Sequence, residues 1–140
     1  MVEDVVSIKS NTKILGISML TSLDNSDLKS FGYNLSNLDY VENLAKIGEK
    51  AGIDGLVSSA EEIPHLKRYL NNTNMLFVTP GIRLNKNKMN DQKRINSPGQ
   101  AIKNGSKMLI IGRSITQSDD PINSIKYILQ DIEKHYEHKN

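Results

Sequence analysis

Four short apolar runs divide the chain, and the segments between them carry apolar residues at helical spacing. The runs occupy residues 13–20, 54–59, 75–79 and 107–112. Short apolar runs bounded by turn residues are typical of strands that are buried on both faces. The pattern therefore predicts four strands separated by helices.

The helical segments have recognisable ends. Ser36 or Asn37 suits the cap of one helix, Ser97 and Pro98 suit the start of another, and glycines follow two of the helices. We predict helices over about residues 1–9, 26–31, 37–51, 60–70, 98–105 and 120–135. The residues expected to face the core are Tyr40, Val41, Leu44, Ala45, Ile47, Ile63, Leu66, Tyr69, Leu70, Ile122, Ile125, Ile128, Leu129 and Ile132.

This alternation of strands and helices predicts an α/β fold with a parallel sheet. A complete (β/α)8 barrel usually needs about 250 residues, whereas the chain has 140. We therefore predict a single partial barrel domain over residues 1–140, equivalent to half of such a barrel. Because the sequence opens on a helix with no strand before it, we expect that a segment which normally precedes it is absent.

Composition excludes several classes of function. The net charge is +2 with both signs interspersed, which argues against a nucleic-acid or membrane surface. The chain has no cysteine, and His65, His135 and His138 lack ligand spacing, so no metal site is expected. The first residues do not resemble a signal peptide, and no apolar run reaches the ~20 residues of a membrane span. A cytoplasmic protein is expected.

Two of the predicted strands end in a glycine and an arginine: Gly81 and Arg83 close one, Gly112 and Arg113 the other. Glycine lets the backbone approach a ligand closely, and arginine presents a planar fork of donors to an oxyanion. In (β/α)8 barrels the loops after the last two strands often hold a phosphate. Two interpretations remain open: a phosphate site, or turns with both arginines in solvent.

Five blocks of sequence carry a resemblance to a known family. With this order and spacing, the chain resembles the C-terminal half of orotidine 5′-monophosphate (OMP) decarboxylase, which makes UMP. The four predicted strands would then be strands 5–8 of the family's TIM barrel. The blocks are residues 18–23, 51–60, 78–83, 91–94 and 111–117.

The resemblance implies roles for five residues. Thr21 would contact the ligand from the barrel mouth, and Arg83, Gly112 and Arg113 would hold the phosphate. Gln92 would lie on a loop that closes over the phosphate and base, and the polar stretch 84–96 has a length suited to such a lid. The family uses no cofactor, and the implied ligand is a nucleotide monophosphate, OMP or UMP.

The family's catalytic motif, Asp-x-Lys-x-x-Asp-Ile-Pro, is absent. In that motif a lysine protonates the carbon that loses CO2, and carboxylates position the lysine. Asp27-Leu28-Lys29 matches only its beginning and falls in a predicted surface helix, so we interpret it as a solvated helix. No residue of this chain is therefore expected to be catalytic, and the isolated chain is expected to be inactive.

Three functions remain open. The chain could be an enzyme half that pairs with a separate N-terminal half-barrel chain, a relic or phosphate-binding fragment, or a related sugar-phosphate barrel enzyme. Residues 13–20 and 107–112 would be edge strands, both apolar and without proline. Ile17, Val57, Phe77 and Ile110, or their neighbours, would face an incomplete barrel interior. We therefore expect self-association or pairing with another half.

Overall fold

The computed structural model describes residues 1–84 and 96–136. Strands and helices alternate along it as the sequence pattern predicts. The elements in chain order are α1 (Val2–Ile8), β1 (Leu15–Ile17), α2 (Asn25–Ser30), α3 (Asn37–Ala51), β2 (Gly55–Val57), α4 (Ile63–Tyr69), β3 (Leu76–Thr79), α5 (Pro98–Asn104), β4 (Met108–Leu109), α6 (Arg113–Thr116) and α7 (Pro121–Tyr136).

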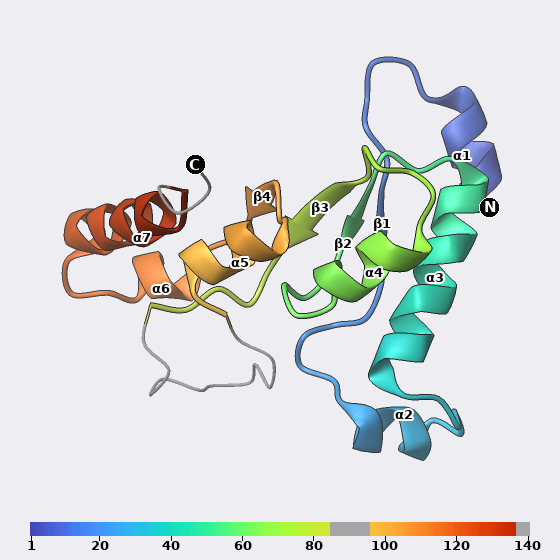
Figure 1. Ribbon diagram of the computed structural model, residues 1–140, viewed down its shortest axis with the longest axis horizontal. Coiled ribbons are helices and arrows are strands. Elements are labelled where there is room, and N and C mark those ends of the chain that lie inside the picture. Colours follow the sequence, from blue (N-terminus) through green and yellow to red (C-terminus); the bar gives the residue numbers. More distant parts are fainter. Residues whose placement is uncertain (85–95, 137–140) are drawn as a thin grey trace.

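The strands form one parallel sheet in the order β1-β2-β3-β4 (Figure 1). Gly55 of β2 aligns with Leu15 of β1 and with Leu76 of β3, and Val78 of β3 aligns with Met108 of β4. The predicted fold class, a parallel α/β half barrel, is confirmed. β1 and β4 are the two edges of this sheet, as expected.

The strands are shorter than predicted, and one helix was not predicted. β4 contains only Met108 and Leu109, although the Ile110 N–H still donates to the Thr79 carbonyl at 2.8 Å. An edge strand is held by a ladder on one side only, so its regular pairing ends early. α6 is a single turn of four residues, which is too short to establish a hydrophobic period.

Helix ends follow the local sequence. The hydroxyls of Ser36 and Ser97 each accept a backbone N–H from three residues further on, at 3.2 Å. Gly52 and Gly105 follow α3 and α5 with φ values of 81° and 109°. Glycine adopts this left-handed conformation without the steric cost of a Cβ. The predicted caps and stops of these two helices are confirmed.

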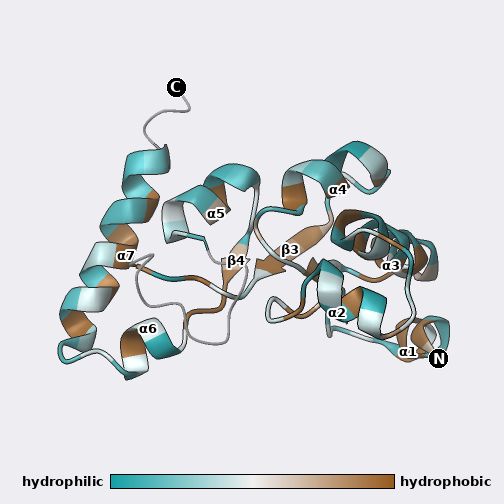
Figure 2. Cartoon of the chain, turned by 90° about the horizontal axis from the view of Figure 1, so that it is seen from below, coloured by the Kyte–Doolittle hydropathy of each residue, from teal (hydrophilic) through white to brown (hydrophobic). Residues whose placement is uncertain are grey.

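One face of the sheet forms the main core with the helices. Leu56 and Phe77 are register neighbours, only 1% and 3% exposed. They belong to a cluster with buried residues of α3 and α4, including Val41, Ala45 and Leu66. Figure 2 shows α3, α4 and α5 along one side of the sheet. The strands are therefore covered by helices on the face that carries Leu56 and Phe77.

The opposite face of the sheet is open at its two edges, whereas Val78 on the inner strand β3 is only 3% exposed. Leu15 and Ile17 are 39% and 66% exposed, and Met108 and Ile110 are 54% and 52% exposed. Because side chains alternate along a strand, Val57 and Val78 share this face with them. The expectation that Phe77 faces the barrel interior is wrong: its side chain packs under the helices, and its neighbour Val78 has the interior orientation.

Several helix residues predicted to face the core are exposed instead. The packing of α7 explains the three that lie on that helix. The helix packs against α5 through a strip that includes Ile128, which is 6% exposed, and Asp131, whose carboxylate accepts the Gly99 N–H at 2.7 Å. A Cβ at Gly99 would collide with the Asp131 carbonyl and the His135 ring, so glycine permits this close approach. The exposed residues are Ile47, Tyr69, Ile122, Ile125 and Leu129.

Candidate phosphate site at the strand ends

The carboxyl ends of the four strands lie at one end of the sheet because all four run parallel. Ligands of parallel α/β proteins bind at this end. Two of the loops that leave it carry the predicted Gly-Arg pairs. These are the loop after β3, with Gly81 and Arg83, and the turn after β4, with Gly112 and Arg113.

A single carbonyl oxygen joins these two loops. Ile82, which is fully buried, accepts a hydrogen bond from Arg83 Nη1 at 2.9 Å and another from Ser114 Oγ at 3.1 Å. Ser114 directly follows Arg113 at the start of α6. The structure thus brings together Arg83 and the Gly112-Arg113 pair, which lie about 30 residues apart in sequence.

The loop after β3 is also fixed at its base. The Arg83 N–H donates to the Asn96 carbonyl at 3.0 Å, and the Asn96 N–H donates to the Gly81 carbonyl at 3.4 Å. Gly81 has a φ of 75°, a conformation that favours glycine. These bonds hold both described ends of the 84–96 stretch against β3. Gln92, predicted to reach over the ligand, lies outside the described residues.

Arg83 has a buried donor that lacks a partner. Its Nη2 atom is buried and makes no hydrogen bond within residues 1–84 and 96–136. Buried polar atoms are normally hydrogen-bonded, so an exception calls for an explanation. A guanidinium donor is satisfied best by an anionic oxygen. An anionic oxygen would suit this donor.

The turn at Gly112 leaves room beside the backbone. A Cβ built on Gly112 would meet no atom within 4 Å among the described residues. The half-buried Arg113 follows it and opens α6. A ligand oxygen could approach the Gly112 backbone there while Arg113 supplies the positive charge.

Thr21 lies at the same end of the sheet but at the other edge. It is 5% exposed and follows β1. β2 and β3 separate β1 from β4, a distance of about 14 Å at the usual spacing between strands. The structure therefore does not place Thr21 with the two arginines, although an extended ligand could span both positions.

Two buried hydroxyls also lie near this end of the sheet. Ser58 Oγ and Thr79 Oγ1 are buried and lack hydrogen-bond partners in the described parts of the chain. They follow Leu56 and Phe77 by two residues, so they lie on the helix-facing side. Strict alternation from Leu56 is the signal that could have placed them there.

The partial match to the catalytic motif is a helix cap. Asp27 accepts the Asp24 N–H at 2.8 Å, and Asp24 accepts the Asp27 N–H in return, which forms a capping box at the start of α2. Leu28 is 2% exposed and packs in the core, while Lys29 is exposed. This arrangement explains Asp27 without a catalytic role.

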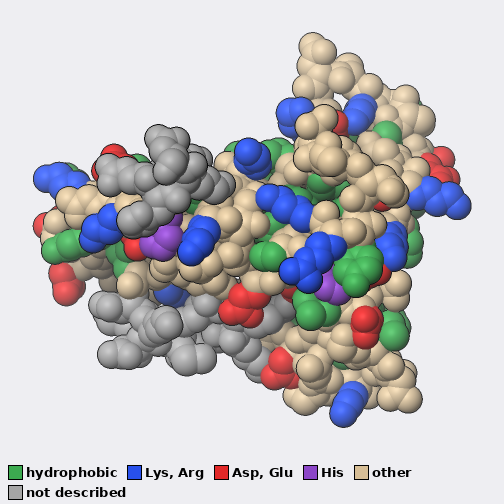
Figure 3. Space-filling model, viewed as in Figure 1, with side chains coloured by type: hydrophobic (Ala, Val, Ile, Leu, Met, Phe, Trp, Pro, Cys, Tyr) green, Lys and Arg blue, Asp and Glu red, His purple; other side chains and the backbone are tan. Residues whose placement is uncertain are grey.

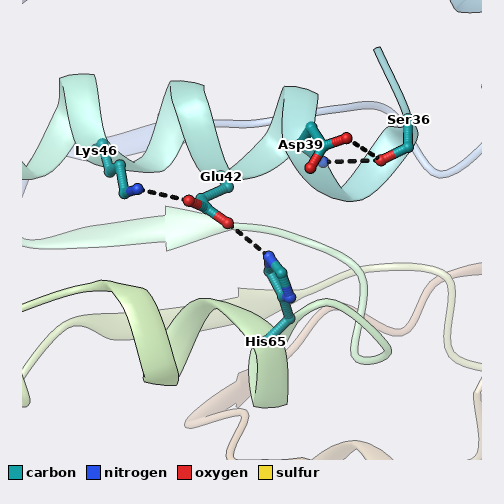
Figure 4. Close-up of polar contacts among 5 residues, drawn as sticks. All are labelled: Ser36, Asp39, Glu42, Lys46 and His65. Carbon is teal, nitrogen blue, oxygen red and sulfur yellow. Dashed lines mark hydrogen bonds and ion pairs between the residues drawn. The ribbon is translucent and has the colours of Figure 1, made fainter.

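The best-formed ionic cluster lies between helices. Glu42 on α3 accepts from Lys46 and contacts His65 Nε2 of α4 at 2.7 Å (Figure 4). The Lys46 ammonium and then the His65 hydrogen bond hold the pKa of Glu42 below its usual value. The ring of Tyr69 contacts both His65 and Lys46. The cluster links α3 to α4 and takes no part in the strand-end site.

A second carboxylate lies at the amino end of the sheet. Asp54 Oδ2, just before β2, contacts Lys9 Nζ at 2.7 Å and accepts the Ile14 N–H at 2.8 Å. These two hydrogen bonds, with Lys9 the stronger influence, lower the pKa of Asp54. A hollow of about 440 Å³ lined by Lys13, Glu49 and Asp54, among others, opens at this end. Both features are remote from the strand-end loops.

Neither a metal site nor a membrane span is found in the described residues. No group of three or more His, Asp or Glu side chains in 1–84 or 96–136 could hold a metal ion. In the same ranges, no helix has the length and apolar character needed to cross a membrane. Basic and acidic side chains are intermingled over the surface seen in Figure 3.

The four parallel strands with helical crossovers define an α/β protein built like half of a (β/α)8 barrel. Residues 1–128 match the sequence profile of the family described as "Orotidine 5′-phosphate decarboxylase / HUMPS family". The chain belongs to this family.

The relatives are about twice as long as the aligned segment. The chain is 43% identical over 127 residues to an orotidine 5′-phosphate decarboxylase of Coxiella burnetii (strain RSA 331 / Henzerling II), covering 91% of this chain and 53% of that protein. It is 44% identical over 121 residues to that of Dictyoglomus thermophilum, covering 86% and 49%. The chain thus spans about half the length of the curated relatives it matches.

Solved structures agree with the fold. The crystal structure of orotidine 5′-phosphate decarboxylase from Lactobacillus acidophilus is similar with a TM-score of 0.69 and 28% identity, over 90% of this chain and 51% of that one. The enzyme from Pyrococcus horikoshii OT3 has a TM-score of 0.64 at 17% identity, which bears on the fold alone. Half of the family's barrel is therefore present here.

Proposed function

We propose that this chain is the C-terminal, phosphate-binding half of an OMP decarboxylase barrel. It binds the 5′-phosphate of OMP or UMP at the ends of β3 and β4. On its own it carries no decarboxylation chemistry.

The buried, unpartnered Nη2 atom of Arg83 carries the proposal. Nη1 of the same side chain donates to the Ile82 carbonyl, which also accepts from Ser114, the residue after Arg113. The two arginines therefore lie on loops that meet at the Ile82 carbonyl. A phosphate dianion satisfies both, because its oxygens accept charge-assisted hydrogen bonds from several donors at once.

Each residue has a role in this proposal. Arg113 and Arg83 supply charge and directed donors, and the backbone at Gly112 adds an N–H close to the phosphate. Thr21, at the far edge of the strand ends, contacts the nucleoside part of the ligand. Gln92 lies outside the described residues. No cofactor is needed for these binding roles.

The decarboxylation chemistry requires groups that this chain does not offer. The family resemblance implies a lysine that protonates the reacting carbon and carboxylates that preorganise its charge. Asp27 and Lys29 match only the beginning of that motif, and Asp27 is engaged in the α2 capping box. An N-terminal half-barrel chain is the partner that would supply the missing groups.

Ligand titration tests the proposal. Isothermal calorimetry or amide chemical shifts should detect binding of UMP, and inorganic phosphate should compete with it. Ribose 5-phosphate should bind more weakly than UMP, because it lacks the base. The absence of binding at millimolar UMP would overturn the proposal and favour a relic. Tighter binding of a sugar phosphate than of UMP would favour the related sugar-phosphate enzymes.

A further inference from the structure

The open face of the sheet carries apolar side chains at both of its edges. Leu15 and Ile17 line the β1 edge, and Met108 and Ile110 line the β4 edge, all between 39% and 66% exposed. Gly55, Val57, Leu76 and Val78 complete the same face by register. None of these residues is charged. Val78 on the inner strand β3 is only 3% exposed, so the exposed apolar side chains gather at the two edges. Apolar side chains exposed at both edges of one sheet face mark an interaction surface.

Both edge strands also offer backbone hydrogen-bonding groups. The sheet order gives β1 and β4 one neighbour each. Neither strand contains a proline, although Lys13 and Lys107 precede them. Unpaired N–H and C=O groups along such an edge are a template for another strand. An occupant that pairs with both edges and covers the face between them would satisfy all of these groups.

The terminal helices extend this apolar surface. On α7, Ile122, Ile125 and Leu129 recur at helical spacing and are 68%, 43% and 54% exposed. On α1, no residue is buried, and Val2 and Val5 are 38% and 43% exposed. α1 precedes the β1 edge and α7 follows the β4 edge. Each edge strand is thus accompanied by a helix with an uncovered apolar side.

We propose that the occupant is a second copy of this chain. β4 of each copy pairs in parallel with β1 of the other, and the two open faces form one closed interior. This arrangement is isologous, because a two-fold axis along the barrel repeats the same β1–β4 contact twice. The result is an eight-stranded barrel of two identical halves with two copies of the strand-end loops.

Geometry and length favour this closure over an open polymer. The chain superposes on 51% of a single-chain orotidine 5′-phosphate decarboxylase with a TM-score of 0.69. It also aligns with 53% of the Coxiella relative. Two copies together therefore have about the barrel circumference and the chain length of one relative. Because a closed barrel has no free strand edge, association stops at two copies.

The proposal does not depend on the proposed phosphate binding, because its contacts lie on the open face and edges rather than in the strand-end loops. An N-terminal half barrel would cover the same surface. The two-copy barrel is therefore the form expected when the chain is purified alone.

Sedimentation of the full chain across a dilution series, without ligand, tests the association. A monomer–dimer equilibrium is expected. Ile17→Lys places a charge on the open face and should weaken dimerisation at least tenfold. The control is Ile47→Lys, the same change at a residue that is 61% exposed on α3, a helix on the covered face of the sheet. Circular dichroism of both variants establishes that they fold.

Disulfide formation tests the pairing of edges, because the natural chain has no cysteine. Ile17→Cys and Ile110→Cys are made as separate variants and mixed under mild oxidation. Disulfide-linked dimers should form mainly between the two different variants, since β1 faces β4 of the other copy.

Three results would overturn the proposal. One is a monomer at every concentration, and another is growth beyond the dimer into open-ended polymers. The third is preferential linking of each cysteine variant to itself, which would indicate pairing between like edges.

Discussion

Ser114 donates a hydrogen bond from Oγ to the carbonyl oxygen of Ile82, 3.1 Å away. Through this contact the turn after β4 is held against the loop after β3. Arg83 uses the same oxygen at 2.9 Å, so the two arginine-bearing segments share one anchor.

The isolated chain should not convert OMP to UMP. It lacks the lysine–carboxylate array, and without a proton donor and preorganised charge most of the barrier lowering is lost. Release of CO2 or formation of UMP by the purified chain is the measurement. Turnover that is well above background and survives repurification would contradict this expectation.

Arg113→Ala should weaken the binding of UMP most, and Arg83→Ala next. A charge-assisted hydrogen bond contributes about 1.5–3 kcal/mol, so each loss corresponds to about tenfold or more in the dissociation constant. Arg68→Ala, at an exposed position on α4, is the matched control and should bind normally. Calorimetry with UMP compares the three variants. If an arginine variant and the unmodified chain bind UMP equally well, that arginine is not part of the site.

Ser114→Ala should affect the ligand more than the fold. Loss of one partly buried hydrogen bond costs about 1 kcal/mol of stability, while the tie between the two loops is broken. The affinity for UMP should therefore fall severalfold with only a small change in melting temperature. Ser30→Ala removes a similar hydroxyl-to-carbonyl bond on α2 and serves as the control. If both variants bind UMP equally well, the anchor has no part in binding.

The two faces of the sheet should respond differently to truncation. Phe77→Ala opens a cavity in the main core and should lower the free energy of unfolding by about 3–5 kcal/mol. Ile17→Ala on the open face should change it by only about 0.5 kcal/mol in the monomer. Urea unfolding at low protein concentration measures both. Similar losses for the two variants would mean that both faces are covered.

Acid should weaken the link between α3 and α4. The pKa of Glu42 is lowered by Lys46 and then His65 from an ordinary value of 4.5. A carboxylate with a depressed folded-state pKa stabilises the fold fully above its unfolded pKa. It loses that contribution as the pH falls below 4.5 and through the lower folded-state value. Glu42→Gln should therefore flatten the decline in melting temperature over this acidic range.

The matched control for this titration is Glu3→Gln, which removes an exposed carboxylate from α1. Its melting temperature should follow that of the unmodified chain at every pH. If Glu42→Gln also follows the unmodified chain, then the ionic cluster in Figure 4 does not contribute to acid stability.

Local features were predictable because neighbouring residues set them. The caps at Ser36 and Ser97 and the left-handed glycines after α3 and α5 depend on backbone groups within one turn. The alternation of apolar runs with helical periods was enough to predict a parallel α/β half barrel. The Gly-Arg pairs were also visible in sequence, whereas the Ile82 carbonyl that joins them was not.

The sequence by itself determined the alternation of the strands with the longer helices, the caps of α3 and α5, the parallel fold class and the family motifs. Tertiary structure decided which face of the sheet is covered, as Phe77 and Ile17 show, and which helix residues remain exposed, as Ile47 and Ile122 show. The reason is physical. Strands of a parallel sheet are apolar on both faces, so their pattern does not reveal which face the helices cover. Contacts such as Ser114 with Ile82 depend on how distant segments pack, and no local period encodes that.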